Sequence, residues 1–174
     1  MIIEFEGKKP QIAESAFIAP TATLIGDVII EEGVGIWFGA VLRGDFGRII
    51  VRKGSCVQDN VVIHVTPDCE TTVGESCSIA HGSILHGCTV EKGAVIGMGS
   101  IIQDFALIGE EAMVAAGSVV PTHMEVPPRH LAAGVPAEIK KEITGTSLMW
   151  TSISASIYRE LAGRYLNQEI GRAR

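Results

Sequence analysis

The histidines are the residues of this sequence whose type and spacing most directly suggest a catalytic site. The chain has five histidines; two lie five residues apart in "HGSILHGC" at 81–88, and a third, His64, ends the run "VVIH". Neutral imidazoles are common zinc ligands, and three of them leave a fourth position open for water. Zinc held in this way lowers the pKa of its water toward 7 and supplies a hydroxide nucleophile. His64, His81 and His86 therefore suit a catalytic metal site, provided that the fold brings them together.

Aliphatic residues at steps of six set the architecture that must position these side chains. The first register reads Ile12, Ile18, Leu24, Ile30, Ile36 and Leu42. After short insertions the period returns at Val51, Val57, Ile63, Val73 and Ile79, and again at Val90, Ile96, Ile102, Ile108, Val114 and Val120. This period suits neither an α-helix nor a long strand, but it suits a short strand followed by a corner. Three such sides make a coil of about 18 residues, so the spacing predicts about six stacked, three-sided coils between Ile12 and Pro121.

The same register predicts the direction of each candidate ligand. Arg43 and His64 directly follow inward aliphatics, and so does His86 if the inward residue before it is Leu85 rather than Ile84. These three side chains should therefore form one outward-facing column. His81 falls on a different side of the prism, so it should reach the same metal only from a second chain packed alongside, in a closed three-fold ring.

Four segments together resemble the γ-class carbonic anhydrase family of the hexapeptide-repeat proteins. They are "LRGD" at 42–45, "QDN" at 58–60, "IH" at 63–64 and "HGSILHGC" at 81–88, and the resemblance covers nearly the whole chain. It implies an all-β solenoid, a left-handed parallel β-helix with a C-terminal α-helix. It also implies a homotrimer that hydrates carbon dioxide reversibly to bicarbonate. Zinc, or in some members iron or cobalt, would be held at each subunit interface by His64 and His86 of one chain and His81 of the next.

The resemblance also implies roles for residues around the metal. Gln58 would orient the reacting water, which suits an amide that both donates and accepts hydrogen bonds. Arg43, Asp45 and Asp59 would form an ion-pair network across the subunit interface. Tyr158, in the C-terminal segment, would border the active site.

One departure from the family concerns the export of protons. Phe46 follows Asp45 where the family's best-studied members carry an acidic residue, and the loop from Val65 to Thr72 offers only Asp68 and Glu70. Hydration should therefore be slow and limited by proton transfer.

The rest of the chain fits a single domain of three parts. Residues 1–121 should form the β-helix and 122–145, which are rich in proline, a connector. Residues 146–174 should form a helix packed along the prism, with an apolar stripe at every fourth position: Met149, Ile153, Ile157, Leu161 and Tyr165.

The charge composition of the chain excludes some classes of binding partner. The formal net charge is −6 and no Lys/Arg run occurs, which argues against nucleic acid and anionic membranes as partners and favours a small-molecule substrate. No segment approaches the roughly 18 apolar residues of a membrane span, and Glu4 and Glu6 do not suit a signal peptide. We therefore expect a cytoplasmic location, with the four cysteines as free thiols.

Three other functions remain open at this point. A hexapeptide acyltransferase would use the same prism without a metal, and a metal-dependent thioesterase would keep the metal but change the substrate. A non-catalytic trimeric scaffold would use the metal only for structure. Nucleotide hydrolysis, serine-hydrolase and zincin chemistry are disfavoured, because the motifs G-x-x-x-x-G-K-[ST], G-x-S-x-G and H-E-x-x-H do not occur.

Overall fold

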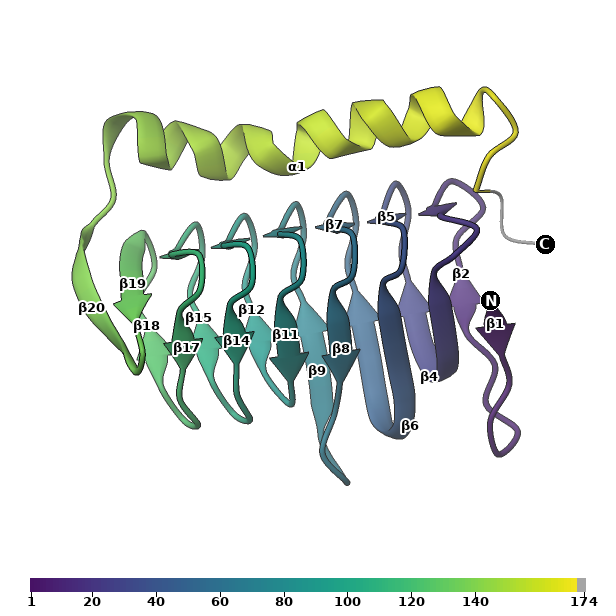
Figure 1. Ribbon diagram of the computed structural model, residues 1–174, viewed down its shortest axis with the longest axis horizontal. Helices are drawn as coiled ribbons and strands as arrows, with labels where there is room; N and C mark the ends of the chain where they lie inside the picture. Colours follow the sequence, from purple (N-terminus) through teal and green to yellow (C-terminus); the bar gives the residue numbers. More distant parts are fainter. Residues whose placement is uncertain (172–174) are drawn as a thin grey trace.

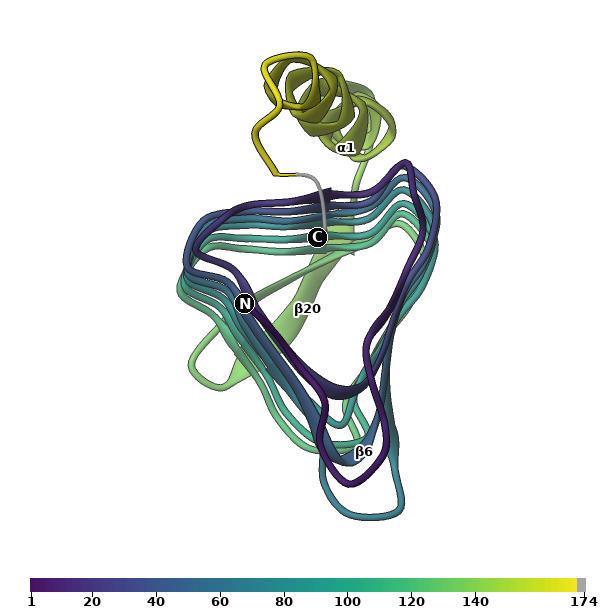
Figure 2. The same cartoon turned by 90° about the vertical axis from the view of Figure 1, so that its right-hand side faces the viewer.

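The six-residue period folds into a three-sided parallel β-solenoid, as the sequence predicts. The computed structural model describes residues 1–171, and the solenoid has about seven turns with one helix lying along it (Figure 1). Viewed down its axis, the solenoid is triangular and the helix lies outside one face (Figure 2).

Each face is a parallel sheet formed by strands from successive coils. The face beneath the helix contains β3 (Phe17–Ile18), β5 (Gly35–Ile36), β7 (Cys56–Val57), β10 (Ser78–Ile79), β13 (Val95–Ile96), β16 (Met113–Val114) and β19 (His130–Gly134). The second face contains β1 (Ile2–Ile3), β8 (Val62–His64), β11 (Ile84–His86), β14 (Ile101–Ile102) and β17 (Val119–Val120). The third contains β2 (Gln11–Ile12), β9 (Glu70–Val73), β12 (Thr89–Val90), β15 (Leu107–Ile108) and β18 (Glu125–Val126). The longer strands β4 (Thr23–Ile30) and β6 (Val41–Val51) pair with strands of both the second and the third face.

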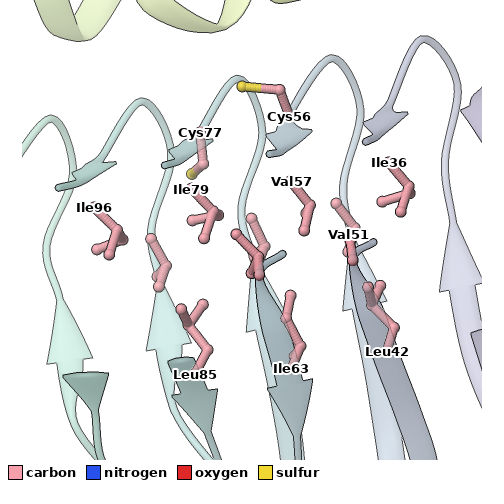
Figure 3. Packing of buried hydrophobic residues seen from close by; sticks show 14 of the residues in the cluster. Ile36, Leu42, Val51, Cys56, Val57, Ile63, Cys77, Ile79, Leu85 and Ile96 are labelled. Atoms are coloured by element: carbon pink, nitrogen blue, oxygen red, sulfur yellow. The ribbon is translucent and has the colours of Figure 1, made fainter. Parts of the chain in front are cut away.

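The anchor aliphatics fill the interior of the prism. Leu42, Ile63 and Leu85 are fully buried and pair in register across β6, β8 and β11 (Figure 3). Each such side chain contributes about 1.5–3 kcal/mol by burial. Leu85 is the inward residue, whereas Ile84 remains 40% exposed, so the register that directs His86 outward is the one present.

The region expected to be a connector contains further solenoid structure. β18 and β19 continue the parallel ladders beyond Pro121, and β20 (Ala137–Glu142) folds back antiparallel to β19. Prolines in this stretch lie at turns between strands, where the missing N–H interrupts no ladder. The antiparallel β20 covers the otherwise open edge of the sheet.

The C-terminal helix is shorter than predicted, and its buried face differs. α1 spans Gly145–Leu166; residues 172–174 of the predicted helix lie outside the described residues. Met149 and Ile157 are about half exposed. The buried helix residues are small: Thr151, Ser154, Ala155 and Ala162. Positions four apart drift by about 40° per step around a helix, so Met149 and Tyr165 cannot share one face.

Candidate metal centre

His64 and His86 lie next to each other on the second face because the coil repeats. They pair in register at the ends of β8 and β11, and His64 Nδ1 lies 3.1 Å from His86 Nε2. Two imidazole nitrogens bound to one tetrahedral zinc would be about 3.3 Å apart, given Zn–N bonds near 2.0–2.1 Å. The two ring nitrogens therefore have the spacing expected of two ligands of one tetrahedral metal.

A carboxylate holds the other nitrogen of each ring. His64 Nε2 lies 2.8 Å from Asp45 Oδ1, and His86 Nδ1 lies 2.7 Å from Asp104 Oδ1. If each ring donates its N–H to its carboxylate, the two nitrogens that face each other at 3.1 Å both carry lone pairs. Such an arrangement needs a cation between the rings, either a metal ion or a proton.

Asp45 is held ionised for this task. Burial opposes ionisation, but hydrogen bonds from Arg43 and His64 outweigh it, so the pKa of the Asp45 carboxyl lies below its usual range. Arg43 Nη1 lies 2.6 Å from Asp45 Oδ2 within the same chain. Arg43 therefore already has an ion-pair partner within its own chain, before any contact that it makes across an interface.

Asp104 is a functional candidate that the sequence interpretation missed. It lies 18 residues after His86, one residue past the position aligned with His86, because Leu85 pairs with Ile102 in the next coil. Gly87 makes the contact possible, because a Cβ there would collide with the Asp104 carboxylate. The register alone aligns His86 with Gln103, so the six-residue period did not point to Asp104.

His81 lies on the turn between β10 and β11, away from the column, as the register predicts. Its Nδ1 lies 2.9 Å from Asp59 Oδ2 and its Nε2 lies 3.1 Å from the Tyr158 hydroxyl on α1. Burial raises the pKa of Tyr158, with Cys56 and Asp59 adding to the shift. If His81 Nδ1–H donates to Asp59, Nε2 accepts a hydrogen bond from the Tyr158 hydroxyl. In all three candidate ligands a carboxylate contacts one ring nitrogen, and in His81 the Tyr158 hydroxyl contacts the other.

Gln58 lies on the same side of the prism as His81, next to Tyr158. Its side chain is buried beneath α1, where the amide nitrogen donates to Ser78 Oγ at 3.1 Å and lies 3.8 Å from Cys56 Sγ. These contacts fix the amide within its own face of the prism. The two remaining histidines are elsewhere: His123 stacks on Phe105, and His130 contacts the Pro128 carbonyl.

Within residues 1–171 of one chain, no three His, Cys, Asp or Glu side chains converge as a metal site. The residues present fit zinc, because the ligands are imidazoles and each has an ordered carboxylate behind it. The surface beside the column is also apolar, with Val62 and Ile84 about 40% exposed.

Comparison with known proteins identifies relatives over nearly the whole chain, although no family model matches it. The carnitine operon protein CaiE of Escherichia coli K12 is 44% identical over 160 residues, covering 92% of this chain and 82% of CaiE. This chain belongs to the CaiE family. Its members are γ-carbonic-anhydrase-like proteins within the hexapeptide-repeat superfamily.

Two solved structures share the fold of this CaiE-family protein. A hexapeptide transferase family protein from Anaplasma phagocytophilum is 38% identical, with a TM-score of 0.92 and coverage of 95% of this chain and 98% of its own. A Bacillus cereus protein provisionally described as an acetyltransferase is 40% identical, with a TM-score of 0.92 and coverage of 95% and 96%. The solenoid of the CaiE-family protein is therefore the left-handed β-helix of hexapeptide-repeat proteins. No helix in the described part of the chain is both long and apolar enough to cross a bilayer.

Proposed function

We propose that this CaiE-family protein is a metal-dependent enzyme that hydrates carbon dioxide reversibly, with each active site shared by two chains of a homotrimer. The observation that carries the proposal is the pair of facing nitrogens, His64 Nδ1 and His86 Nε2, at 3.1 Å. Because Asp45 and Asp104 take the outer N–H groups, the inner nitrogens present two lone pairs to a shared cation. His81 of a neighbouring chain supplies the third ligand.

Zinc bound there would lower the pKa of water toward 7 and provide a nucleophile for carbon dioxide. The chain's own residues do the positioning. Asp45, Asp104 and Asp59 hold the three rings in the tautomer that binds metal. The Tyr158 hydroxyl, which keeps its proton at neutral pH, occupies His81 Nε2 in the isolated chain and becomes available to bind an oxygen once that nitrogen is engaged.

A second chain must supply one ligand because His81 and the His64–His86 pair lie on different sides of one prism, and a closed three-fold ring repeats that contact at each interface. The apolar surface at Val62 and Ile84 lies beside that pair and suits burial by a neighbour. A stable specific contact of this kind buries roughly 1,200 Å² or more per chain pair. Sedimentation as a monomer at micromolar concentration would contradict the proposal.

Proton release is the weak step of the proposed reaction. Phe46 packs against His64 with ring centroids 5.5 Å apart, so the position beside Asp45 holds a side chain that transfers no proton. Asp68, on the loop between β8 and β9, and Glu70, the first residue of β9, remain as the relay candidates. A small diffusible base such as imidazole should therefore raise kcat with little change in kcat/KM. Stopped-flow hydration assays on zinc-loaded trimer test this, and no hydration at any imidazole concentration would refute the assignment.

Acyl transfer is the second candidate, because the 38–40% identical structures are described as a hexapeptide transferase and an acetyltransferase. In an acyltransferase the cation between His64 and His86 would be a proton, and no metal would be needed. Metal content of protein purified without added metal separates the two functions. If the trimer, stripped of metal by a chelator, transfers an acyl group from a thioester to an amine or alcohol, the result favours acyl transfer. A purely structural role predicts bound metal with neither carbon dioxide hydration nor acyl transfer.

A further inference from the structure

A long apolar groove begins at His81 and runs along the edge of α1. Its volume is about 600 Å³, within the range of small-molecule sites. Gln58, His81 and Tyr158 supply polar groups at one end. Beyond them the walls include five large apolar side chains: Met98, Met113, Trp150, Ile157 and Leu161.

Much of this apolar surface is left open to solvent in the chain. Met98 is 57% exposed, Ile157 48% and Trp150 44%. Large apolar side chains gathered on one surface commonly mark a binding site. Here the polar groups lie at one end only, which suits a ligand with one polar head and one apolar tail.

The repeat sets the length of that tail. The corners at His81, Met98 and Ala116 stack in successive coils, because Gly99 donates its N–H to the His81 carbonyl and Gly117 donates to the Met98 carbonyl, each at 2.9 Å. Two inter-strand steps of about 4.8 Å carry the groove roughly 10 Å past His81, the length of about eight carbon–carbon bonds. Carbon dioxide would use only the first part of this space.

We infer that the groove binds the apolar acyl chain of a thioester or ester whose carbonyl carbon lies at the His81 end. The inference rests on the proposed function, since the same activated water would attack that carbon. A bond forms between the water oxygen and the carbonyl carbon, and the C–S or C–O bond to the leaving group breaks. The leaving group departs with one proton as a thiol or alcohol, and the carboxylic acid product gives its own proton to solvent.

Binding can be measured apart from catalysis. Straight-chain carboxylates from butanoate to dodecanoate should quench the half-exposed Trp150 of the trimer, whereas Trp37 is buried and should report little. Affinity should rise by up to about fourfold per methylene and level off near eight carbons, where the groove ends. Hydrolysis of the matching acyl thioesters of N-acetylcysteamine, and of the matching ethyl esters, should show the same dependence in kcat/KM and separates the two leaving groups.

Two substitutions test the groove as the origin of that dependence. Ala115→Leu fills the far end and should move the optimum to about four to six carbons, as expected from the added side-chain volume. Ala133→Leu, at a half-buried alanine of β19 outside the groove, is the matched control and should leave the optimum unchanged. Should Ala115→Leu fold poorly, Met98→Ala should weaken octanoate binding about tenfold, while Met149→Ala, at a similarly exposed methionine outside the lining, should not.

The outcomes distinguish this inference from the function on which it rests. Carbon dioxide hydration together with carboxylate affinity that is independent of chain length overturns the acyl groove and leaves the proposed function standing. Chain-length-dependent binding without hydration or hydrolysis supports the groove and overturns the proposed chemistry. If a neighbouring subunit fills the groove, no carboxylate will bind at any length, and the inference fails.

Discussion

The two parts of the candidate centre are built in different ways. His64 and His86 lie side by side because one outward position recurs in successive coils, and their spacing comes directly from the strand ladder. His81 lies on a turn and takes its orientation from Asp59 on a neighbouring turn and Tyr158 on the helix. The pair of rings forms within one chain, whereas His81 lies on a turn away from that pair. A repeat therefore readily supplies a pair of ligands on one face, and closing the site requires a second surface.

The largest expected effect comes from removing a ligand on either side of this comparison. His86→Ala and His81→Ala should each abolish metal retention. Removing one of three ligands should lower metal affinity by more than the 10–100-fold typical of removing a residue that only orients a ligand. Metal analysis after gel filtration measures this. If the His81→Ala variant retains its metal, His81 is not a ligand and the metal is held by His64 and His86 without it.

Mixing the two variants decides whether the ligands come from different chains. In a trimer that contains both variants, the interface between the intact His64–His86 pair of one chain and the intact His81 of the other is a complete centre. Equal co-expression should restore about a quarter of the wild-type metal per chain, since about three quarters of random trimers contain one such centre. If all three ligands belonged to one chain, mixing would restore nothing.

The supporting carboxylates should give the next largest effect. Asp104→Asn and Asp59→Asn each remove the charge that orients a ring, so each should weaken metal affinity by about 10–100-fold. Asp68→Asn, on the exposed loop between β8 and β9, is the control and should leave affinity unchanged. An effect of Asp104→Asn alone would show that His81 takes no part in binding.

The sequence predicted the repeated half of this architecture better than the other half. The register left Ile84 and Leu85 open as the inward residue and put His64 and His86 in one column only if it was Leu85, which is the residue that is fully buried. Asp104 was missed because the register aligns it with Gly87, not with His86. Gln58 was assigned from resemblance, which does not reveal that its amide is engaged by Ser78. The helix face was mispredicted because a four-residue spacing drifts around the helix axis.

Arg43 should affect assembly more than the solenoid itself. Its side chain is 42% exposed and contacts Asp45, at the edge of the surface proposed to meet a neighbour. Arg43→Ala should raise the trimer dissociation constant about tenfold, equivalent to about 1.4 kcal/mol. Sedimentation across a dilution series measures the shift. Arg52→Ala removes a similarly exposed arginine paired with Glu31 and should not change assembly.

The smallest expected effect concerns Asp27, a carboxylate that has cationic partners, as Asp45 has, but no histidine. Burial opposes its ionisation, but hydrogen bonds from Arg48 and Lys8 outweigh burial and lower its pKa. Because the pKa in the folded state lies below that in the unfolded state, the stabilisation is fully present above about pH 4 and is lost as pH falls through the folded-state value. Both cations are at least half exposed, so solvent screening limits the contribution to about 1 kcal/mol or less.

Urea unfolding at pH 7 and at pH 3 should show that Asp27→Asn lowers the free energy of unfolding at the higher pH and has a smaller effect at the lower one. Metal content should stay at the wild-type level, since Asp27 supports a coil and orients no ligand. Loss of metal in Asp27→Asn would mean that coil geometry, rather than the carboxylates behind the rings, controls the centre.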